Sequence, residues 1–254
     1  MTLRSHVGLL LLAICPCRPA ALAADEPKSI PPDRVIGAVY GKPVTAGDVG
    51  LAKPIDVSEK FDAANRARWE QMGRIQQAFG LPIQERFVRD KKLVVTDAEI
   101  ARFLETSKKL DERHKKEWTE RLAAIAQELA VPNLAADKTA KLREEQKMLE
   151  GFLRPSPPPL DAGPEKELAR MFILPWKIER ELQRTYGGRV IFQQFGLEAL
   201  DARRKLYEAA EAAGDLKFDD PGVRHLFYYY ANMPHTTGGD EKALEKPWFF
   251  EEVD

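Results

Sequence analysis

Hydrophobic residues along this chain follow two periods, and the first is that of a strand. Residues 35–39 form a short extended run rich in β-branched side chains. Residues 40–42 provide a tight turn, and residues 43–44 begin a return strand. The pattern predicts one β-hairpin. Thr45 followed by Asp48 predicts a helix directly after it, because a hydroxyl caps the free amides and an acid favours the first turn.

After the hairpin the hydrophobic residues recur at helical spacing. Trp69, Met72, Ile75 and Phe79 mark one face of a helix. Pro82 interrupts this face, because proline has no amide hydrogen to donate within a helix. The face then resumes at Ile83, Phe87 and Val88.

A second helix start lies within residues 91–105. Thr96 precedes a hydrophobic periodic run, and Glu99 stands three residues later. This spacing is that of a capping box, in which each of the two side chains accepts a hydrogen bond from the backbone amide of the other residue.

The order of these motifs resembles the N-terminal domain of the SurA-type periplasmic chaperones and the related parvulin-linked foldases. That group carries a pattern like V-A-x-V-N-G-x-x-I-T-x-x-D-(L/V), an amphipathic helix, and then G-(I/V)-x-V-(S/T)-D-x-E-(I/L). Residues 35–49 and 93–100 match this pattern. There are two departures, because Tyr40 stands in place of the usual Asn and Leu93 stands where a Gly-apolar pair is expected. The resemblance implies one helical domain over residues 33–195, with residues 166–195 packed on the helix of residues 69–79.

A long αα-hairpin is predicted within that domain, over residues 96–153. Two hydrophobic helical faces are separated by a Pro-Asn turn. Ten basic and ten acidic side chains between Glu105 and Glu150 predict solvated, salt-bridged outer faces. The proline-rich residues 154–164 are typical of a stiff connector, and a helix interrupted at Pro175 is expected after them.

Residues 196–254 are predicted to form a helical C-terminal region of unknown role. Helices are expected over residues 198–213 and from Pro221, whereas residues 235–243 are expected to form a mobile acidic loop. The final Glu-Glu-Val-Asp resembles a cytosolic heat-shock tail, and we interpret it as coincidence. The fold class expected overall is mainly α, with one small β-hairpin, the αα-hairpin and this region.

The first 23 residues are typical of a signal peptide, with Arg4, a short apolar core and Ala21-Leu22-Ala23 as a cleavage site. We expect an exported, periplasmic protein without stable membrane insertion. Cys15 and Cys17 would be removed, and a lipoprotein attached at Cys15 is the less favoured alternative. The chain has 39 basic and 40 acidic side chains, so loss of Arg4 and Arg18 leaves 37 basic groups and a net charge of −3. This charge does not favour nucleic-acid partners.

The sequence contains no phosphate loop, nucleophile elbow or zinc motif, so no catalytic residue, metal ligand or cofactor is assigned. The resemblance implies a chaperone that binds unfolded or partly folded exported proteins without ATP. Related foldases often carry a parvulin prolyl-isomerase domain, which is not recognisable here. Alternatives are a non-catalytic subunit that docks one folded partner through the αα-hairpin and, less favoured, a peptidyl-prolyl isomerase. The candidate peptide-binding residues are aromatic or large and apolar: Trp69, Met72, Phe79, Phe103, Phe172, Trp176, Phe192 and Phe195.

Overall fold

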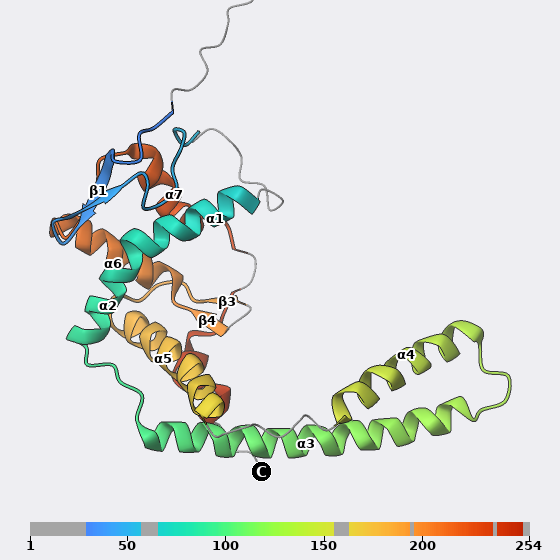
Figure 1. Cartoon of the computed structure of the whole chain (residues 1–254). Helices are drawn as coiled ribbons and strands as arrows, with labels where there is room; N and C mark the ends of the chain where they lie inside the picture. The colour runs from blue at the N-terminus through green and yellow to red at the C-terminus, as the bar shows by residue number, and fades with distance from the viewer. Residues whose placement is uncertain (1–28, 57–65, 155–162, 194–195, 236–237, 251–254) are drawn as a thin grey trace, which may run out of the picture.

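The computed structural model describes residues 29–56, 66–154, 163–193, 196–235 and 238–250, and it confirms a mainly α fold with a few short antiparallel strands. The predicted signal peptide and most of the predicted connector lie outside these residues. A body of packed helices and strands carries a long arm made by α3 and α4 (Figure 1). In chain order the elements are β1 (Val35–Val39), β2 (Lys42–Thr45), α1 (Arg66–Ile75), the π-helix η1 (Gln76–Gly80), α2 (Leu81–Asp90), α3 (Asp97–Leu129), α4 (Ala136–Leu153), α5 (Gly163–Tyr186), β3 (Ile191–Gln193), β4 (Gly196–Glu198), α6 (Leu200–Ala212), β5 (Leu216–Phe218), α7 (Pro221–Asn232) and the 3-10 helices η2 (Glu241–Leu244) and η3 (Trp248–Phe250).

The predicted hairpin is present as β1 and β2, paired antiparallel with Val39 opposite Lys42. Tyr40 and Gly41 both adopt positive φ, at 50° and 74°, as a two-residue turn of this kind requires. The sequence did not indicate the third strand, β5, which pairs antiparallel with β1 on the side away from β2. β1 therefore lies at the centre of a three-stranded sheet.

The helix predicted after the hairpin is absent, although its capping contacts form. The Thr45 amide donates to the Asp48 carboxylate at 2.7 Å, and the Asp48 amide donates to the Thr45 hydroxyl at 3.3 Å. The chain turns at this point, and Gly50 takes a positive φ of 62°. The cap motif here closes a turn because no hydrophobic helical face follows it.

One long helical path runs through α1, η1 and α2 without the interruption expected at Pro82. Pro82 occupies the first turn of α2, where an amide hydrogen is not needed. The preceding turn is the π-helix η1, which holds one residue more per turn. The proline is thereby accommodated without breaking the path.

The main hydrophobic core is built by segments from both ends of the chain. The rings of Phe79 in η1 and Phe218 in β5 pack in a tilted arrangement with centroids 4.8 Å apart, and Phe227 of α7 contacts both rings. We expected residues 166–195 to cover the helix of residues 69–79. Instead α6 and α7 cover it, whereas α5 packs on α6 and α3. The C-terminal region therefore completes the core that the N-terminal hairpin begins.

Helix α5 is continuous through Pro175, contrary to the interruption expected from the sequence. Pro175 is exposed, so the carbonyl one turn earlier that loses its partner lies on the same, solvent-facing side. Ile173, two residues before Pro175 and so on the opposite face of the helix, is buried. Burial of that face stabilises the helix across the proline.

Helix α3 begins with the predicted capping box and packs on two different helices along its length. The Thr96 amide donates to Glu99 at 2.8 Å, and the Glu99 amide donates back to the Thr96 hydroxyl at 3.2 Å. Its first half packs on α5, whereas its second half runs antiparallel to α4 (Figure 1). The turn between the two helices contains Asn133 at a positive φ of 59°.

The arm has a hydrophobic seam and a salt-bridged surface. Ile125, Leu142 and Leu149 form a buried cluster of their own. Arg121 joins the two helices, because its guanidinium donates to Glu145 at 2.8 and 2.9 Å and to Glu128 at 2.9 Å. The balanced outer charges predicted from the sequence thus form ion pairs across the hairpin.

We predict that Thr96→Ala lowers the free energy of unfolding by about 1 kcal/mol, because the first turn of α3 loses its cap. Urea denaturation followed by circular dichroism measures this. Thr119→Ala is the matched control. Thr119 lies within α3 and donates only to the Lys115 carbonyl of its own helix, so this change should leave stability within about 0.5 kcal/mol of wild type. Equal effects of the two substitutions would contradict the role of the cap.

Candidate functional site

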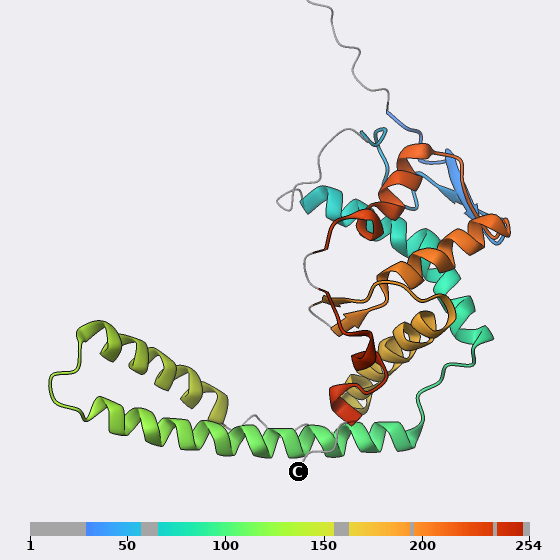
Figure 2. The ribbon, with the colours of Figure 1, turned by 180° about the vertical axis from the view of Figure 1, so that it is seen from behind.

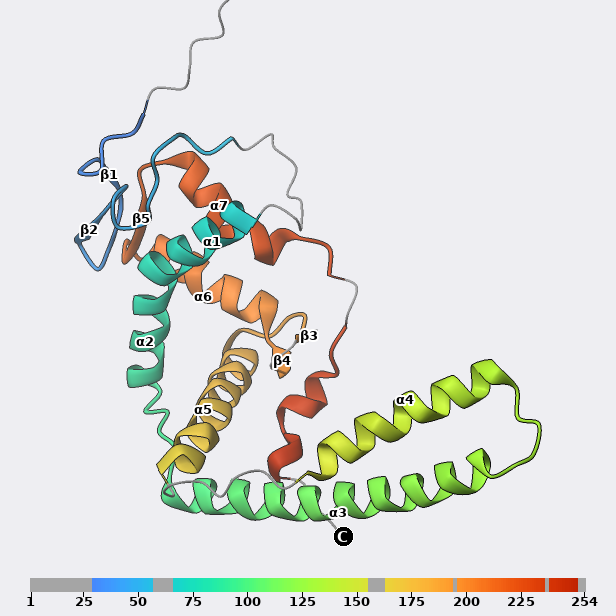
Figure 3. The same ribbon diagram turned by 45° about the vertical axis from the view of Figure 1, so that its right-hand side comes forward.

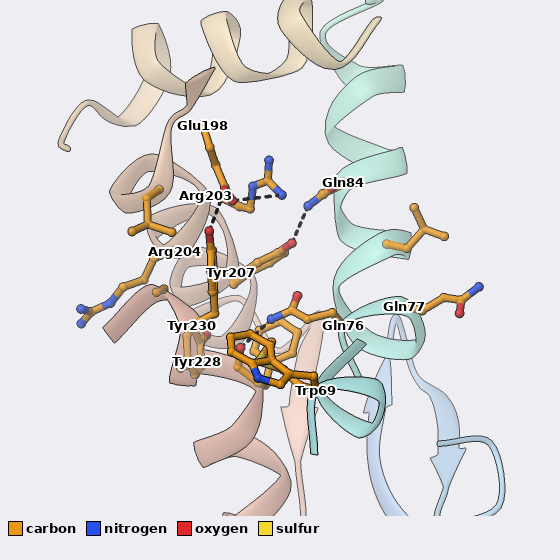
Figure 4. Close-up of a pocket in the computed structure, with 15 residues that line it drawn as sticks. Trp69, Gln76, Gln77, Gln84, Glu198, Arg203, Arg204, Tyr207, Tyr228 and Tyr230 are labelled. Atoms are coloured by element: carbon orange, nitrogen blue, oxygen red, sulfur yellow. Dashed lines mark hydrogen bonds and ion pairs between the residues drawn. The ribbon is translucent and has the colours of Figure 1, made fainter. Parts of the chain in front are cut away.

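The body contains a pocket between the α1–η1–α2 path on one side and α6 and α7 on the other (Figure 4). Its volume is about 460 Å³. We call it the body pocket. The residues that line it are mostly aromatic, apolar or amide-bearing: Trp69, Met72, Gln76, Gln77, Leu81, Gln84, Glu198, Leu200, Arg203, Arg204, Tyr207, Phe227, Tyr228, Tyr230 and Ala231.

The first wall follows from helical spacing and from the π turn. Trp69, Met72 and Gln76 stand at i, i+3 and i+7 and so share one face of the helical path. The additional residue in η1 brings Gln77 to the pocket as well. The Gln76 amide donates to the backbone carbonyl of Phe227, which ties this wall to α7.

The opposite wall consists of α7 and α6 side chains. The aromatic run at residues 227–230 places Phe227, Tyr228 and Tyr230 around the pocket (Figure 4). Tyr207 of α6 accepts a hydrogen bond from Gln84 at 2.6 Å. Four aromatic rings thus line this side of the pocket, of which Tyr207, Phe227 and Tyr228 are largely buried.

A charged group closes the α5 side of the pocket. Arg203 pairs with the buried Glu179 of α5 and with Glu198 of β4, the latter at 3.5 Å. The backbone amide of Ala199 donates to Glu179 at 2.8 Å. Burial raises the pKa of Glu179, and Arg203 opposes that shift only in part. Desolvation disfavours the charge on Arg203, but the two glutamates outweigh it and its pKa is raised.

The tyrosine hydroxyls of the pocket remain protonated at neutral pH. Burial, together with Glu198, raises the pKa of Tyr230 to about 12, and the Tyr230 hydroxyl donates to Glu198 at 3.3 Å. Burial also raises the pKa of Tyr207. These groups are hydrogen-bonding groups, not bases, so the pocket combines an aromatic lining with neutral polar groups.

None of the three histidines in the part that the structure describes lines this pocket, although His235 packs on the ring of Tyr230, which does. His114 is half-buried on the arm and stacks on Trp118 at 5.6 Å. His225 meets Tyr229 edge-on, and the His235 ring nitrogen lies 2.9 Å from the Tyr230 carbonyl oxygen. Within the described ranges no group of three or more potential ligands is placed to hold a metal ion. Over the same ranges no helix is long and apolar enough to cross a membrane.

The eight candidate peptide-binding residues do not line one common site. Trp69 and Met72 line the body pocket, but Phe79 is wholly buried in the core and has no surface to offer a ligand. Phe103, Phe172 and Trp176 belong to a separate cluster between α3 and α5. Phe192 is 59% exposed on β3, and Phe195 lies outside the described residues. Helical periodicity identified the hydrophobic faces, but it could not distinguish the residues that are buried in the core from those that line the pocket.

Sequence reasoning missed the α6 and α7 wall. Tyr207, Tyr228 and Tyr230 line the pocket, yet none was a candidate. A signal was present, because four successive aromatic residues at 227–230 cannot all point to one buried face of a helix. Some of these rings must therefore lie at a surface or a pocket.

We predict that Arg203→Met lowers the free energy of unfolding by about 3 kcal/mol, because Glu179 is left buried without its cation. The loss should grow as the pH rises from about 5 to 8. The folded state then keeps a proton on Glu179 that the unfolded state, with an ordinary pKa of about 4.3, has released. Urea denaturation at several pH values measures both effects.

Arg204→Met is the matched control, since Arg204 is the next residue of α6 and also lines the pocket. Its partners are the half-exposed Glu208 and the exposed Asn232, so the cost should stay below about 1 kcal/mol without this pH dependence. If the free energy of unfolding lost in Arg203→Met did not depend on pH, this would contradict the raised pKa of the buried Glu179.

Comparison with known proteins identifies no relative from which a function could be assigned. No family model, no curated protein and no solved structure matches this chain. The resemblance to SurA-type chaperones stays a prediction that rests on the motifs within residues 33–106.

Proposed function

We propose that this protein is an exported, ATP-independent chaperone that holds short extended segments of unfolded polypeptides in the body pocket. The observation that carries the proposal is the pocket's lining, in which Trp69 and aromatic rings of α6 and α7 border a volume of about 460 Å³. An unfolded chain offers side chains of many shapes together with its backbone amides. An aromatic lining with amide and phenol groups suits both, because it needs no particular charge on the ligand.

The size of the pocket favours weak, reversible binding. One or two aromatic side chains bury about 150–250 Å² each. At about 25 cal/mol per Å² this gives several kcal/mol, from which the cost of immobilising a flexible chain is subtracted. Affinities of roughly micromolar or weaker follow. A chaperone without ATP needs such affinities, because it has no other means of releasing its client.

The second candidate function is docking of one folded partner through the arm. A specific observation favours it: Met148 and Phe152 of α4 are 52% and 54% exposed, and Phe152 lies beside Trp118 with ring centroids 5.1 Å apart. The arm extends away from the body (Figure 3). A partner could therefore reach this surface without contacting the body pocket.

A prolyl isomerase has less support from the described residues. His114 stacks on Trp118, His225 and His235 contact tyrosines of α7, and none of the three lines the body pocket. The site offers binding groups in place of a convergent pair of histidines.

We predict that the mature chain suppresses aggregation of a chemically unfolded outer-membrane protein, measured by light scattering at several molar ratios. Leu81→Gln and Trp69→Gln should each weaken suppression about threefold or more, because they place an amide where the lining is hydrophobic. Leu81 is 44% exposed, so its change should leave the fold intact. Phe79, although a candidate from the sequence, is unsuitable because it is wholly buried.

Met171→Gln is the control, because Met171 is a large, 71% exposed side chain of α5 that does not line the pocket. It should suppress aggregation like wild type. Absence of suppression by well-folded wild-type protein would sink the chaperone proposal. Suppression lost in Phe152→Gln but kept in Leu81→Gln would move the assignment to the arm.

Export is the second part of the proposal and has its own test. We predict that the protein isolated from its host begins at Ala24, as shown by N-terminal sequencing and intact mass. A mass that includes Cys15 with attached lipid would support the lipoprotein alternative, and an intact Met1 terminus would contradict export through cleavage after Ala23.

A further inference from the structure

Residues 238–250, which we call the C-terminal segment, cross the body to reach α3. The Gly239 amide donates to the Val190 carbonyl at 2.9 Å, which holds the start of the segment beside β3. The segment then follows α5 through η2 and reaches α3 at η3. Seen from behind, it is the dark red chain that ends between α5 and α3 (Figure 2).

Two successive phenylalanines anchor this segment. Phe249 is buried, and its ring lies 5.4 Å from Phe103 of α3 and 5.8 Å from Trp176 of α5. The Phe250 ring packs on the edge of Trp176 at 5.4 Å, and the guanidinium of Arg102 lies 5.2 Å over it. Aromatic pairs in these arrangements stabilise beyond the area that they bury.

Side chains of the body hold the backbone of the segment. The Trp176 indole donates to the Leu244 carbonyl at 2.6 Å, and Arg102 donates to the Phe250 carbonyl at 2.7 Å. Two short 3-10 turns are its only regular structure within the described residues. Side-chain bonds to carbonyls combined with aromatic anchors are the means by which proteins bind short peptides.

Charge complementarity adds to these contacts. Arg184 of α5 forms a two-pronged ion pair with Glu245, one bond of which measures 2.9 Å. Gln183 donates to Glu241 at 3.0 Å. Of the acidic loop expected at residues 235–243 to be mobile, Glu241 therefore contacts α5.

The surface that receives the segment is made by α3 and α5 themselves. Its cluster has five buried members, of which Ile100, Phe103, Ala169 and Ile173 belong to the two helices and only Phe249 to the segment. A cavity of about 460 Å³ lies beside it, lined by Arg102, Trp176 and Arg180 together with Glu245 and Phe250. We call the two helices' part of this cluster the α3–α5 surface.

We propose that the α3–α5 surface is a second peptide-binding site and that residues 241–250 are its resident, exchangeable ligand. The ligand class is a short peptide with two adjacent aromatic residues and an acidic residue four positions before the first of them, as in Glu245, Phe249 and Phe250. An equivalent peptide supplied from outside competes with the chain's own segment. The site is separate from the body pocket, and the proposal does not rest on the chaperone function.

The test uses a fluorescein-labelled peptide of residues 239–250 and fluorescence anisotropy. The full chain carrying Phe249→Ser with Phe250→Ser, which empties the site, should bind it at least tenfold more tightly than wild type. A peptide with the same two serines should not bind. Arg184→Glu added to the emptied chain should weaken binding up to about fivefold, and Glu245→Arg in the peptide should restore it. The exposed Val94→Ser is the control and should behave like wild type.

Hydrogen exchange of the wild-type chain provides a second measurement that needs no substitution. Excess unlabelled peptide should speed exchange of the amides in residues 241–250 and leave those of α6 and α7 unchanged. A folded double variant that fails to bind the peptide overturns the proposal and makes the segment a permanent structural latch. Hydrogen exchange of residues 241–250 that does not change at millimolar peptide would also overturn the proposal.

Discussion

The packing of Phe79 beneath the central strand is the contact on which the rest of the body depends. Gly37 of β1 lets the ring approach, since a Cβ at this position would lie 2.8 Å from the ring and 2.3 Å from the Lys217 carbonyl oxygen. Phe218 and Phe227 complete the aromatic group. Three segments far apart in the sequence therefore meet at one point. The body pocket lies at the rim of this group, because Phe227 belongs to both.

The length of α3 is the second constraint. A helix of 33 residues spans about 50 Å, which is more than the body can cover. Its first half is buried by α5 and the C-terminal segment, and its second half obtains a core only by pairing with α4. The arm and the α3–α5 surface are consequences of the same long helix. A substitution that destabilises the start of α3 would therefore affect both the arm and the α3–α5 surface.

The charged groups of the body pocket pair with one another inside the protein. The terminal nitrogens of Arg203 pair with Glu179 and Glu198, whereas its Nε is buried without a hydrogen-bond partner, and the neighbouring tyrosines hold their protons. What remains for a ligand is aromatic surface and amides. The C-terminal segment illustrates the same chemistry elsewhere in the molecule, because rings, indole and guanidinium groups hold it by side chain and backbone together.

The sequence by itself determined the local elements of this protein. The hairpin at residue 40, the capping box at Thr96, the helix after Pro221 and the paired helices of the arm all follow from short-range patterns, because capping, turn geometry and hydrophobic periodicity act over a few residues. Only the tertiary structure decided which hydrophobic faces meet. It buried Phe79, left Trp69 at a pocket, carried α5 past Pro175 and placed Phe249 against Trp176. These outcomes depend on contacts between residues of different elements, such as Phe79 with Phe218 and Phe249 with Trp176, and no local pattern specifies such a partner.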